Sequence, residues 1–147
     1  MVLETLRFWP PAVITDRICV KPYVIEPENS NEKHIYLEKD DALWIPIVGI
    51  HRDQKYYANP DVFDPERFND ENKSKIDPYT YLPFGVGPRN CIGSRFALME
   101  SKILFYHLLS RFSLVKTAKT PVVIKLKTAS INLQSEDGFW VGLKLRL

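Results

Sequence analysis

The stretch FGVGPRNCIG, residues 84–93, is the most informative part of this sequence. It contains three of the six glycines in the chain and one of the two cysteines, Cys91. Glycine has no side chain to hold a flat, bulky ligand away from the backbone, so such a ligand can approach this turn closely. Arg89 adds a permanent cation whose planar fork matches a carboxylate. The stretch therefore indicates a ligand site as well as a turn.

A helix is expected directly after the cysteine. From Ile92, apolar residues recur at helical spacing and predict a largely buried helix that runs to about Arg111. Cys91, one residue before this helix, would face free backbone N–H groups and the positive end of the helix dipole, which favour a thiolate over a thiol. An iron porphyrin suits such a site, because its metal binds the thiolate and its propionates bind the arginine. A plain buried cysteine in a turn is the alternative.

The composition argues against several other classes of protein. The 20 basic and 18 acidic residues are interspersed along the 147-residue chain, whereas a dedicated nucleic-acid binder concentrates its basic residues on one face. Two cysteines, Cys19 and Cys91, do not make a disulfide scaffold, and no C-x-x-C pair indicates zinc. Glu4 and Arg7 interrupt the first apolar residues, which argues against a signal peptide. No run approaches the roughly 20 apolar residues that a spanning helix needs.

The pattern along the rest of the chain predicts an α+β fold with much irregular structure. A helix over the first eight residues should end at the double proline at 10–11, because proline cannot continue the helical hydrogen bonds. Polar runs are expected to form a surface loop at 26–34 and a turn at 39–41. Strands are expected at 12–20, 23–25, on both sides of the turn within 35–50, and as a C-terminal hairpin from 122–127 and 139–147 that turns at 136–138. Residues 57–81 form a long meander with a short helical turn near Pro60.

The cysteine stretch fits a specific family pattern at five positions. Phe84, Gly87, Arg89, Cys91 and Gly93 match the spacing F-x-x-G-x-R-x-C-x-G. In this pattern the sequence resembles the haem-thiolate monooxygenases, the cytochrome P-450 family. The wording around the cysteine is most similar to the microsomal animal enzymes that oxidise lipophilic compounds. The resemblance implies that residues 1–147 are the C-terminal portion of a single cytochrome P-450 domain, about the last third of a family member.

Two further stretches carry the resemblance in the family's order. Glu4 and Arg7 in ETLR match the E-x-x-R motif, whose spacing places both side chains on one helix face. NPDVFDPERF, residues 59–68, matches the family's P-x-x-F-x-P-E-R-F segment completely. The resemblance implies that Arg67 from this segment joins Glu4 and Arg7 in a buried structural triad. Such a triad would pin the meander against the first helix.

The resemblance also implies roles for individual residues around a haem (iron-protoporphyrin IX). Cys91 would be the axial ligand of the iron, with Arg89 and Arg17 as partners of the propionates. The other cofactor contacts would be Phe84, Ile92, Gly93 and Ala97, and the substrate pocket would be lined by Ala12, Val13, Ile14 and Ile131. For Arg17 a surface charge at a strand end, and for the pocket residues plain core packing, are the alternatives. His34, His51 and His107 are not expected to bind the metal, and His51 is interpreted as a hydrogen-bonded structural residue.

Two interpretations of function follow from the resemblance. In the first, the chain is part of a monooxygenase that inserts one oxygen atom from O2 into a lipophilic small molecule, with electrons from an NADPH-dependent flavoprotein reductase. That enzyme would sit on the cytosolic face of the endoplasmic reticulum membrane through an N-terminal anchor, and its oxygen-activating helix would precede residue 1. In the second, the chain is a short, non-catalytic product that at most binds haem.

Overall fold

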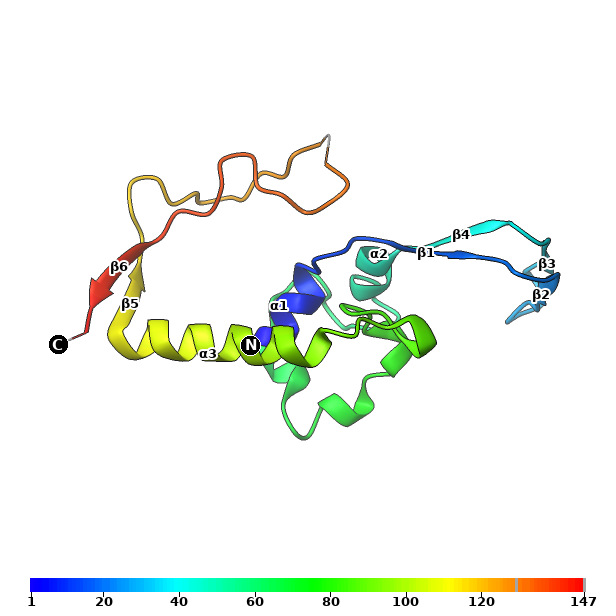
Figure 1. Ribbon diagram of the computed structural model, residues 1–147, viewed down its shortest axis with the longest axis horizontal. Coiled ribbons are helices and arrows are strands. Elements are labelled where there is room, and N and C mark those ends of the chain that lie inside the picture. Colours follow the sequence, from blue (N-terminus) through cyan, green and yellow to red (C-terminus); the bar gives the residue numbers. More distant parts are fainter. Residues whose placement is uncertain (129, 147) are drawn as a thin grey trace.

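The structure, a computed structural model, describes residues 1–128 and 130–146. Figure 1 shows an extended arrangement in which a two-stranded ribbon and a long helix project from a small central body. The elements in chain order are α1 (Val2–Phe8), β1 (Thr15–Ile18), β2 (Tyr23–Ile25), β3 (Ile35–Leu37), β4 (Ala42–Ile45), α2 (Ile47–His51), the 3-10 helices η1 (Pro65–Phe68), η2 (Lys73–Lys75), η3 (Pro78–Thr80) and η4 (Gly87–Arg89), then α3 (Ser94–Arg111), β5 (Phe112–Val115) and β6 (Gly142–Leu145). This mixture of helices, short strands and irregular segments confirms the predicted α+β class.

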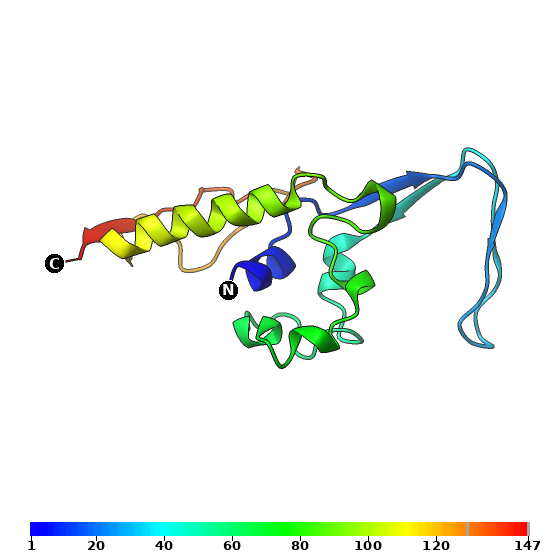
Figure 2. The ribbon, with the colours of Figure 1, turned by 60° about the horizontal axis from the view of Figure 1, so that its bottom comes forward.

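The strands pair into three antiparallel, two-stranded units. β1 pairs with β4, and β2 pairs with β3 further out along the same ribbon. The ribbon projects away from the rest of the chain in both views (Figures 1 and 2). The strands within 35–50 lie where the sequence predicted them, but Pro46 ends the second one. The prediction of strand beyond Pro46 is wrong, because residues 47–51 form α2.

The small core lies where α1, α2 and the meander meet. Its buried apolar side chains are Ile47, Tyr57 and Leu82. Four buried residues at the same place are polar or charged, namely Glu4, Arg7, His51 and Thr80. A core with this many buried polar groups depends on their hydrogen bonds, because each unpaired polar group would cost free energy.

The meander is less irregular than its sequence indicates. A turn closes near Pro60, where Val62 N–H donates to Asn59 C=O at 3.0 Å, as predicted. Two 3-10 helices of the meander begin at an Asp-Pro pair. Asp64 and Asp77 accept hydrogen bonds from backbone N–H groups two residues ahead, and the proline that follows fits the first helical position.

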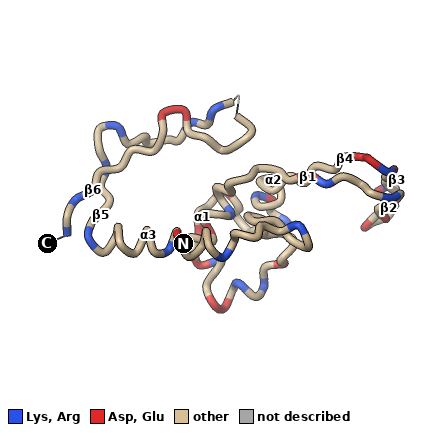
Figure 3. The backbone as a smooth tube through the Cα atoms, viewed as in Figure 1, with Lys and Arg blue, Asp and Glu red and all other residues tan. Residues whose placement is uncertain are grey.

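The predicted long helix is present, but the prediction that it is largely buried is wrong. α3 has no buried residue, and Phe96, Leu104 and Tyr106 are each more than 60% exposed. Its C-terminal half carries no charge between Lys102 and Arg111 (Figure 3). Part of this apolar surface, at Phe105, Tyr106 and Leu109, lines an open apolar groove of about 610 Å³ whose other walls are residues of α1 and Leu114 of β5.

The predicted C-terminal hairpin is also wrong in its pairing. β6 pairs with β5, from the end of α3, in the register Phe112↔Leu145 to Val115↔Gly142. Residues 122–127 make a single isolated bridge, between Leu126 and Ser135. The last residue of the predicted strand, Leu147, lies outside the described residues. None of the helices in the described ranges is both long and apolar enough to cross a lipid bilayer.

Candidate functional site

An open depression of about 440 Å³ brings the cysteine loop next to the segment that follows α1. Its lining residues are Pro11, Ala12, Ile14, Thr15, Arg17, Ile47, Pro83, Phe84, Gly85, Arg89 and Cys91. Six of these were singled out from the sequence: Cys91, Arg89, Arg17, Phe84, Ala12 and Ile14. The depression therefore combines one thiol, two guanidinium groups and an apolar wall.

Two glycines shape the cysteine loop. Gly85 and Gly87 have φ angles of +72° and +81°, in the left-handed region where a side chain causes strain. The loop is closed by Cys91 N–H, which donates to Phe84 C=O at 2.8 Å. This bond fixes the backbone of the cysteine on the backbone of the phenylalanine that opens the loop.

Cys91 lies slightly further from the long helix than its sequence position indicated. α3 begins at Ser94 with Gly93 as its N-cap, so the cysteine lies two residues before the cap rather than directly before the helix. The cysteine is exposed, and a Cβ built on Gly93 would lie 3.9 Å from its sulfur. Ile92 is fully exposed beside it, and Ala97 is half-buried on the first turns of α3.

The two arginines of the depression differ in how firmly they are held. Arg17 Nη1 donates to Asp16 C=O at 2.7 Å and to Thr15 Oγ1 at 3.2 Å, both on its own strand β1. Arg89 is exposed on η4 and forms no ion pair with any carboxylate in the part of the chain that the structure describes. Both guanidinium groups therefore keep donors that an anionic ligand group can use.

Two of the residues that the sequence assigned to a substrate pocket lie outside the lining of this depression. Val13 is half-buried, and its C=O accepts a hydrogen bond from Val48 N–H at 3.1 Å, which ties the segment to α2. Ile131 is 64% exposed in the loop that precedes β6. The structure brings Ala12 and Ile14 to the cysteine but does not bring these two residues into the depression.

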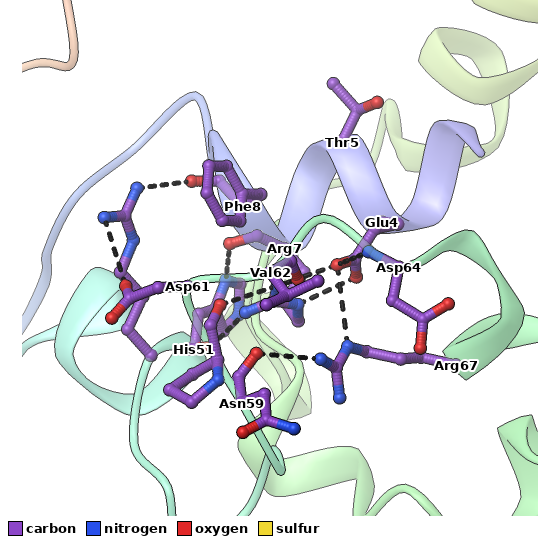
Figure 4. Close-up of polar contacts among 12 residues, drawn as sticks. Glu4, Thr5, Arg7, Phe8, His51, Asn59, Asp61, Val62, Asp64 and Arg67 are labelled. Carbon is purple, nitrogen blue, oxygen red and sulfur yellow. Dashed lines mark hydrogen bonds and ion pairs between the residues drawn. The ribbon is translucent and has the colours of Figure 1, made fainter.

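Glu4, Arg7 and Arg67 meet on one side of α1 (Figure 4). Glu4 and Arg7 are fully buried and paired in a bidentate manner, with Arg7 Nε donating to Glu4 Oε2 at 2.8 Å and Nη2 donating to Oε1 at 2.7 Å. Arg67 Nε lies 3.6 Å from Glu4 Oε1, which makes a looser ion pair. Arg67 Nη2 donates to Asn59 C=O at 2.9 Å.

The charged pair also holds the backbone of the meander. Arg7 Nη2 donates to Pro60 C=O at 2.9 Å, and Asp64 N–H donates to Glu4 Oε1 at 3.0 Å. Arg7 Nη1 donates to His51 C=O at 2.7 Å. A buried ion pair is tolerated only when such additional hydrogen bonds satisfy its remaining donors and acceptors. Here they also join α1, α2 and the meander into one unit.

His51 is the residue whose importance the sequence analysis underestimated. Its ring is fully buried, with Nδ1 3.0 Å from Arg7 C=O and Nε2 2.7 Å from Leu82 N. Burial lowers the pKa of the imidazole to about 4, and the nearby Arg7 cation acts in the same direction, against the hydrogen bond to the Arg7 backbone. The partners lie 44 and 31 residues away, so no local sequence pattern pointed to them.

Comparison with known proteins agrees with the motifs in this site. The sequence model described as Cytochrome P450 matches residues 1–140, which include the E-x-x-R helix, the meander and the cysteine loop. The chain belongs to the cytochrome P-450 family.

Three animal proteins of this family illustrate the similarity. It is 58% identical over 146 residues to cytochrome P-450 9e2 of Blattella germanica and 44% identical over 146 residues to probable cytochrome P-450 9f2 of Drosophila melanogaster. It is 42% identical over 132 residues to cytochrome P-450 3A12 of Canis lupus familiaris. These matches cover 99%, 99% and 89% of this chain but only 27%, 28% and 25% of the relatives. The chain thus spans about a quarter of the length of the curated relatives it matches.

Members of the cytochrome P-450 family bind haem, and the donor set of the depression fits this group. No group of three or more His, Cys, Asp or Glu side chains that could hold a bare metal ion occurs within 1–128 and 130–146. A haem iron needs only one protein ligand on the cysteine side, because the porphyrin supplies four nitrogens. One exposed thiol beside two arginines and a glycine turn meets that requirement.

Proposed function

We propose that this chain forms the haem-thiolate part of a microsomal monooxygenase that inserts one oxygen atom from O2 into a lipophilic substrate. The observation that carries the proposal is the depression in which Cys91 and Arg89 face the apolar residues Ala12 and Ile14. Residues 1–147 would then be the C-terminal portion of a single domain. The matched share of the relatives, about a quarter, is compatible with that division.

Each residue of the depression has a distinct task in this proposal. Cys91 binds the iron through its thiolate, and Arg89 and Arg17 hold the propionates through charge-assisted hydrogen bonds. The haem, when bound, supplies the redox chemistry of O2. Gly85 and Gly87 let the backbone approach the ring, and Phe84 would shield the sulfur from water once the haem is bound. Shielding matters because a thiolate in a drier, apolar environment is a stronger electron donor to the metal.

The remaining assignments extend from this centre. Gly93 leaves room beside the sulfur, while Ile92 and Ala97 border the porphyrin on the cysteine side. The exposure of Ile92 supports its assignment, because a fully exposed isoleucine has apolar surface available for a ligand. The substrate contacts are proposed to come from Ala12, Val13, Ile14 and Ile131, which are all apolar and therefore suit a lipophilic molecule.

The triad of Glu4, Arg7 and Arg67 is proposed to be structural. Its buried pair holds the meander, and the meander leads directly into the cysteine loop. Electrons are proposed to come from an NADPH-dependent flavoprotein reductase that docks on the face around Cys91, where Arg89 and Arg95 are exposed and could meet an acidic partner. The complete protein is proposed to lie on the cytosolic face of the endoplasmic reticulum membrane through a segment outside this chain.

The two cysteines of the chain provide a matched test of the iron ligand. In the complete haem-loaded protein, the reduced carbon monoxide complex is expected to show the red-shifted Soret band of a thiolate-bound haem. Cys91→Ser and Cys91→His are each expected to abolish this shift. Cys19→Ser is expected to retain it, because Cys19 lies at the end of β1 and its thiol donates to Lys21 C=O at 2.9 Å. A red-shifted band in the Cys91 variants would refute the assignment.

A further inference from the structure

The ring of His51 joins the charged cluster to the segment that leads to the cysteine. Leu82 N–H can only donate, so His51 Nε2, at 2.7 Å, must be the acceptor in this contact. The ring is therefore the neutral tautomer with its proton on Nδ1, and Nδ1–H donates to Arg7 C=O at 3.0 Å. One buried side chain thus uses both of its nitrogens to connect α1 with the end of the meander.

The end of the meander is held at three consecutive residues. Tyr57 Oη donates to Thr80 C=O at 3.0 Å, Tyr81 Oη donates to Leu3 C=O at 2.9 Å, and Leu82 N–H donates to the His51 ring. The Tyr81 ring also stacks on the His51 ring, with centroids 5.7 Å apart and an interplanar angle of 19°. Of the three contacts, the one to His51 is the closest in sequence to the cysteine loop.

Backbone hydrogen bonds continue from that contact to the sulfur-bearing residue. Leu82 is buried, and its C=O accepts a hydrogen bond from Gly85 N–H at 3.1 Å. Phe84 C=O accepts from Cys91 N–H at 2.8 Å. Between them, Pro83 has no N–H and a fixed φ angle, so this stretch has little freedom to adjust. A shift of Leu82 would therefore move the backbone on which Cys91 rests.

We propose that His51 is a positioning residue, which fixes Leu82–Phe84 and through it the Cys91 sulfur relative to the cluster of Glu4, Arg7 and Arg67. This inference rests on the proposed role of Cys91 as the iron ligand. His51 acts through its hydrogen bond to Leu82 N–H and does not contact the ligand group. The titratable or charged groups that face its ring are Arg7, from α1, and Tyr81, from the meander.

Two conservative variants separate the two halves of the His51 link. In His51→Gln, the amide oxygen can take the place of Nε2 and accept from Leu82 N–H, but the donor to Arg7 C=O is lost. In His51→Asn, the shorter amide can take the place of Nδ1 and donate to Arg7 C=O, but Leu82 N–H loses its acceptor. Both variants remove the same ring from the Tyr81 stack. A merely structural role would therefore make the two variants similar.

The measurement is the rate at which the red-shifted carbon monoxide band of the complete haem-loaded protein converts to the unshifted form on gentle warming. His51→Asn is expected to convert about tenfold faster than the parent protein, the effect of one buried donor left unpaired, and His51→Gln to stay within about twofold. Thermal unfolding midpoints of the two variants, measured in parallel, should differ much less than these rates.

Each other outcome overturns the inference. Equal rates for the two variants, whether fast or slow, would show that the Leu82 contact does not set the position of the sulfur. Failure of both variants to load haem would also contradict it, because His51→Gln is required to keep the site. Cys91→Ser, measured beside them, keeps the two proposals separate: if that variant retains the red-shifted band, the ligand assignment itself is wrong.

Discussion

Arg7 and His51 form a reciprocal pair of hydrogen bonds, in which the side chain of each residue donates to the backbone carbonyl of the other. Arg7 Nη1 donates to His51 C=O at 2.7 Å, and His51 Nδ1–H donates to Arg7 C=O at 3.0 Å. Each residue lies in the last turn of its own helix, α1 or α2, where carbonyl groups lack partners within the helix. The two short helices therefore cap one another. Removing either side chain would leave a buried carbonyl group of the other helix without its hydrogen-bond donor.

This mutual cap predicts an acid-sensitive fold. The pKa of His51 is about 4 in the folded protein, whereas an unfolded histidine titrates near pH 6.5. Between these values the unfolded state binds more protons, so the free energy of unfolding should fall as the pH falls from about 6.5 to 4, by up to about 3 kcal/mol. Above pH 6.5 the contribution of His51 is complete and constant.

The control for this prediction is the His51→Gln variant, which has no titratable group at the position. Denaturant unfolding of the complete protein at pH 7, 6, 5 and 4.5 should give a steeper loss of stability in the parent than in the variant. Parallel slopes for the parent and His51→Gln would show that His51 does not titrate in this range.

The charged cluster should be far more sensitive to substitution than the surface ion pairs. Glu4→Gln leaves the Arg7 cation buried without its counter-charge, and we expect it to lower the free energy of unfolding by about 3–5 kcal/mol. Arg67→Lys should cost less, because Arg67 Nε contacts Glu4 at 3.6 Å and only its Nη2 makes a hydrogen bond, to Asn59 C=O.

Glu28→Gln is the matched surface control. Glu28 pairs with Lys55 at 3.4 Å where both side chains are well exposed, so its loss should give no measurable change. Urea or guanidinium unfolding curves of the complete protein give all three values. We expect the loss in the free energy of unfolding to be largest for Glu4→Gln, smaller for Arg67→Lys and smallest for Glu28→Gln. An Arg67→Lys variant less stable than Glu4→Gln would contradict this prediction.

What the sequence predicted correctly depends on local pattern. The end of α1 follows from a double proline, and the turn near Pro60 follows from local turn chemistry. The exposure of α3 could not be predicted, because periodicity reports which face is apolar but not which element covers it. The pairing of β6 with β5 was missed because residues 122–127 have the same alternating pattern and are closer to β6 in the sequence than β5 is. A turn signal also lies between residues 122–127 and β6.

In the candidate site, too, the residues of a local motif were predictable, whereas contacts between distant segments were not. Cys91, Arg89 and Phe84 belong to one short motif, so their approach in the depression was expected from spacing alone. The partners of His51 come from segments far away in the sequence, and a single histidine in a helix carries no mark of them. Hydrogen bonds between distant segments depend on the tertiary fold. The residue pattern indicates which side chains are buried but not which partners they meet.

Asp40 offers a test of backbone strain in the ribbon. Its φ angle is +75°, in the left-handed region that glycine occupies without cost. Asp40→Gly should therefore raise the free energy of unfolding, by about 0.5 kcal/mol once the greater freedom of glycine in the unfolded chain is subtracted. Asp41→Gly, next to it, should instead destabilise, because the Asp41 carboxylate accepts from Glu38 N–H at 2.7 Å. Chemical unfolding distinguishes the two signs, and a destabilised Asp40→Gly would show that the conformation is not strained.

Arg89 should control how firmly the haem is held. Its guanidinium lines the depression on the side of Cys91 and forms no ion pair with a described carboxylate, so its donors remain available for a propionate. Loss of one charge-assisted hydrogen bond predicts that Arg89→Gln releases haem about tenfold faster. Arg17→Gln should have a smaller effect, since Arg17 already donates to Thr15 and Asp16.

The measurement is the rate of haem transfer from the complete protein to an excess of a haem-scavenging apoprotein. Arg146→Gln removes an exposed arginine that hydrogen bonds to Ser113. Neither residue lines the depression, so this variant should leave the rate unchanged. Raising the salt concentration should narrow the difference between the parent and Arg89→Gln, because the group is exposed and its charge is screened. Equal release rates for Arg89→Gln and Arg146→Gln would mean that the guanidinium of Arg89 does not bind a propionate.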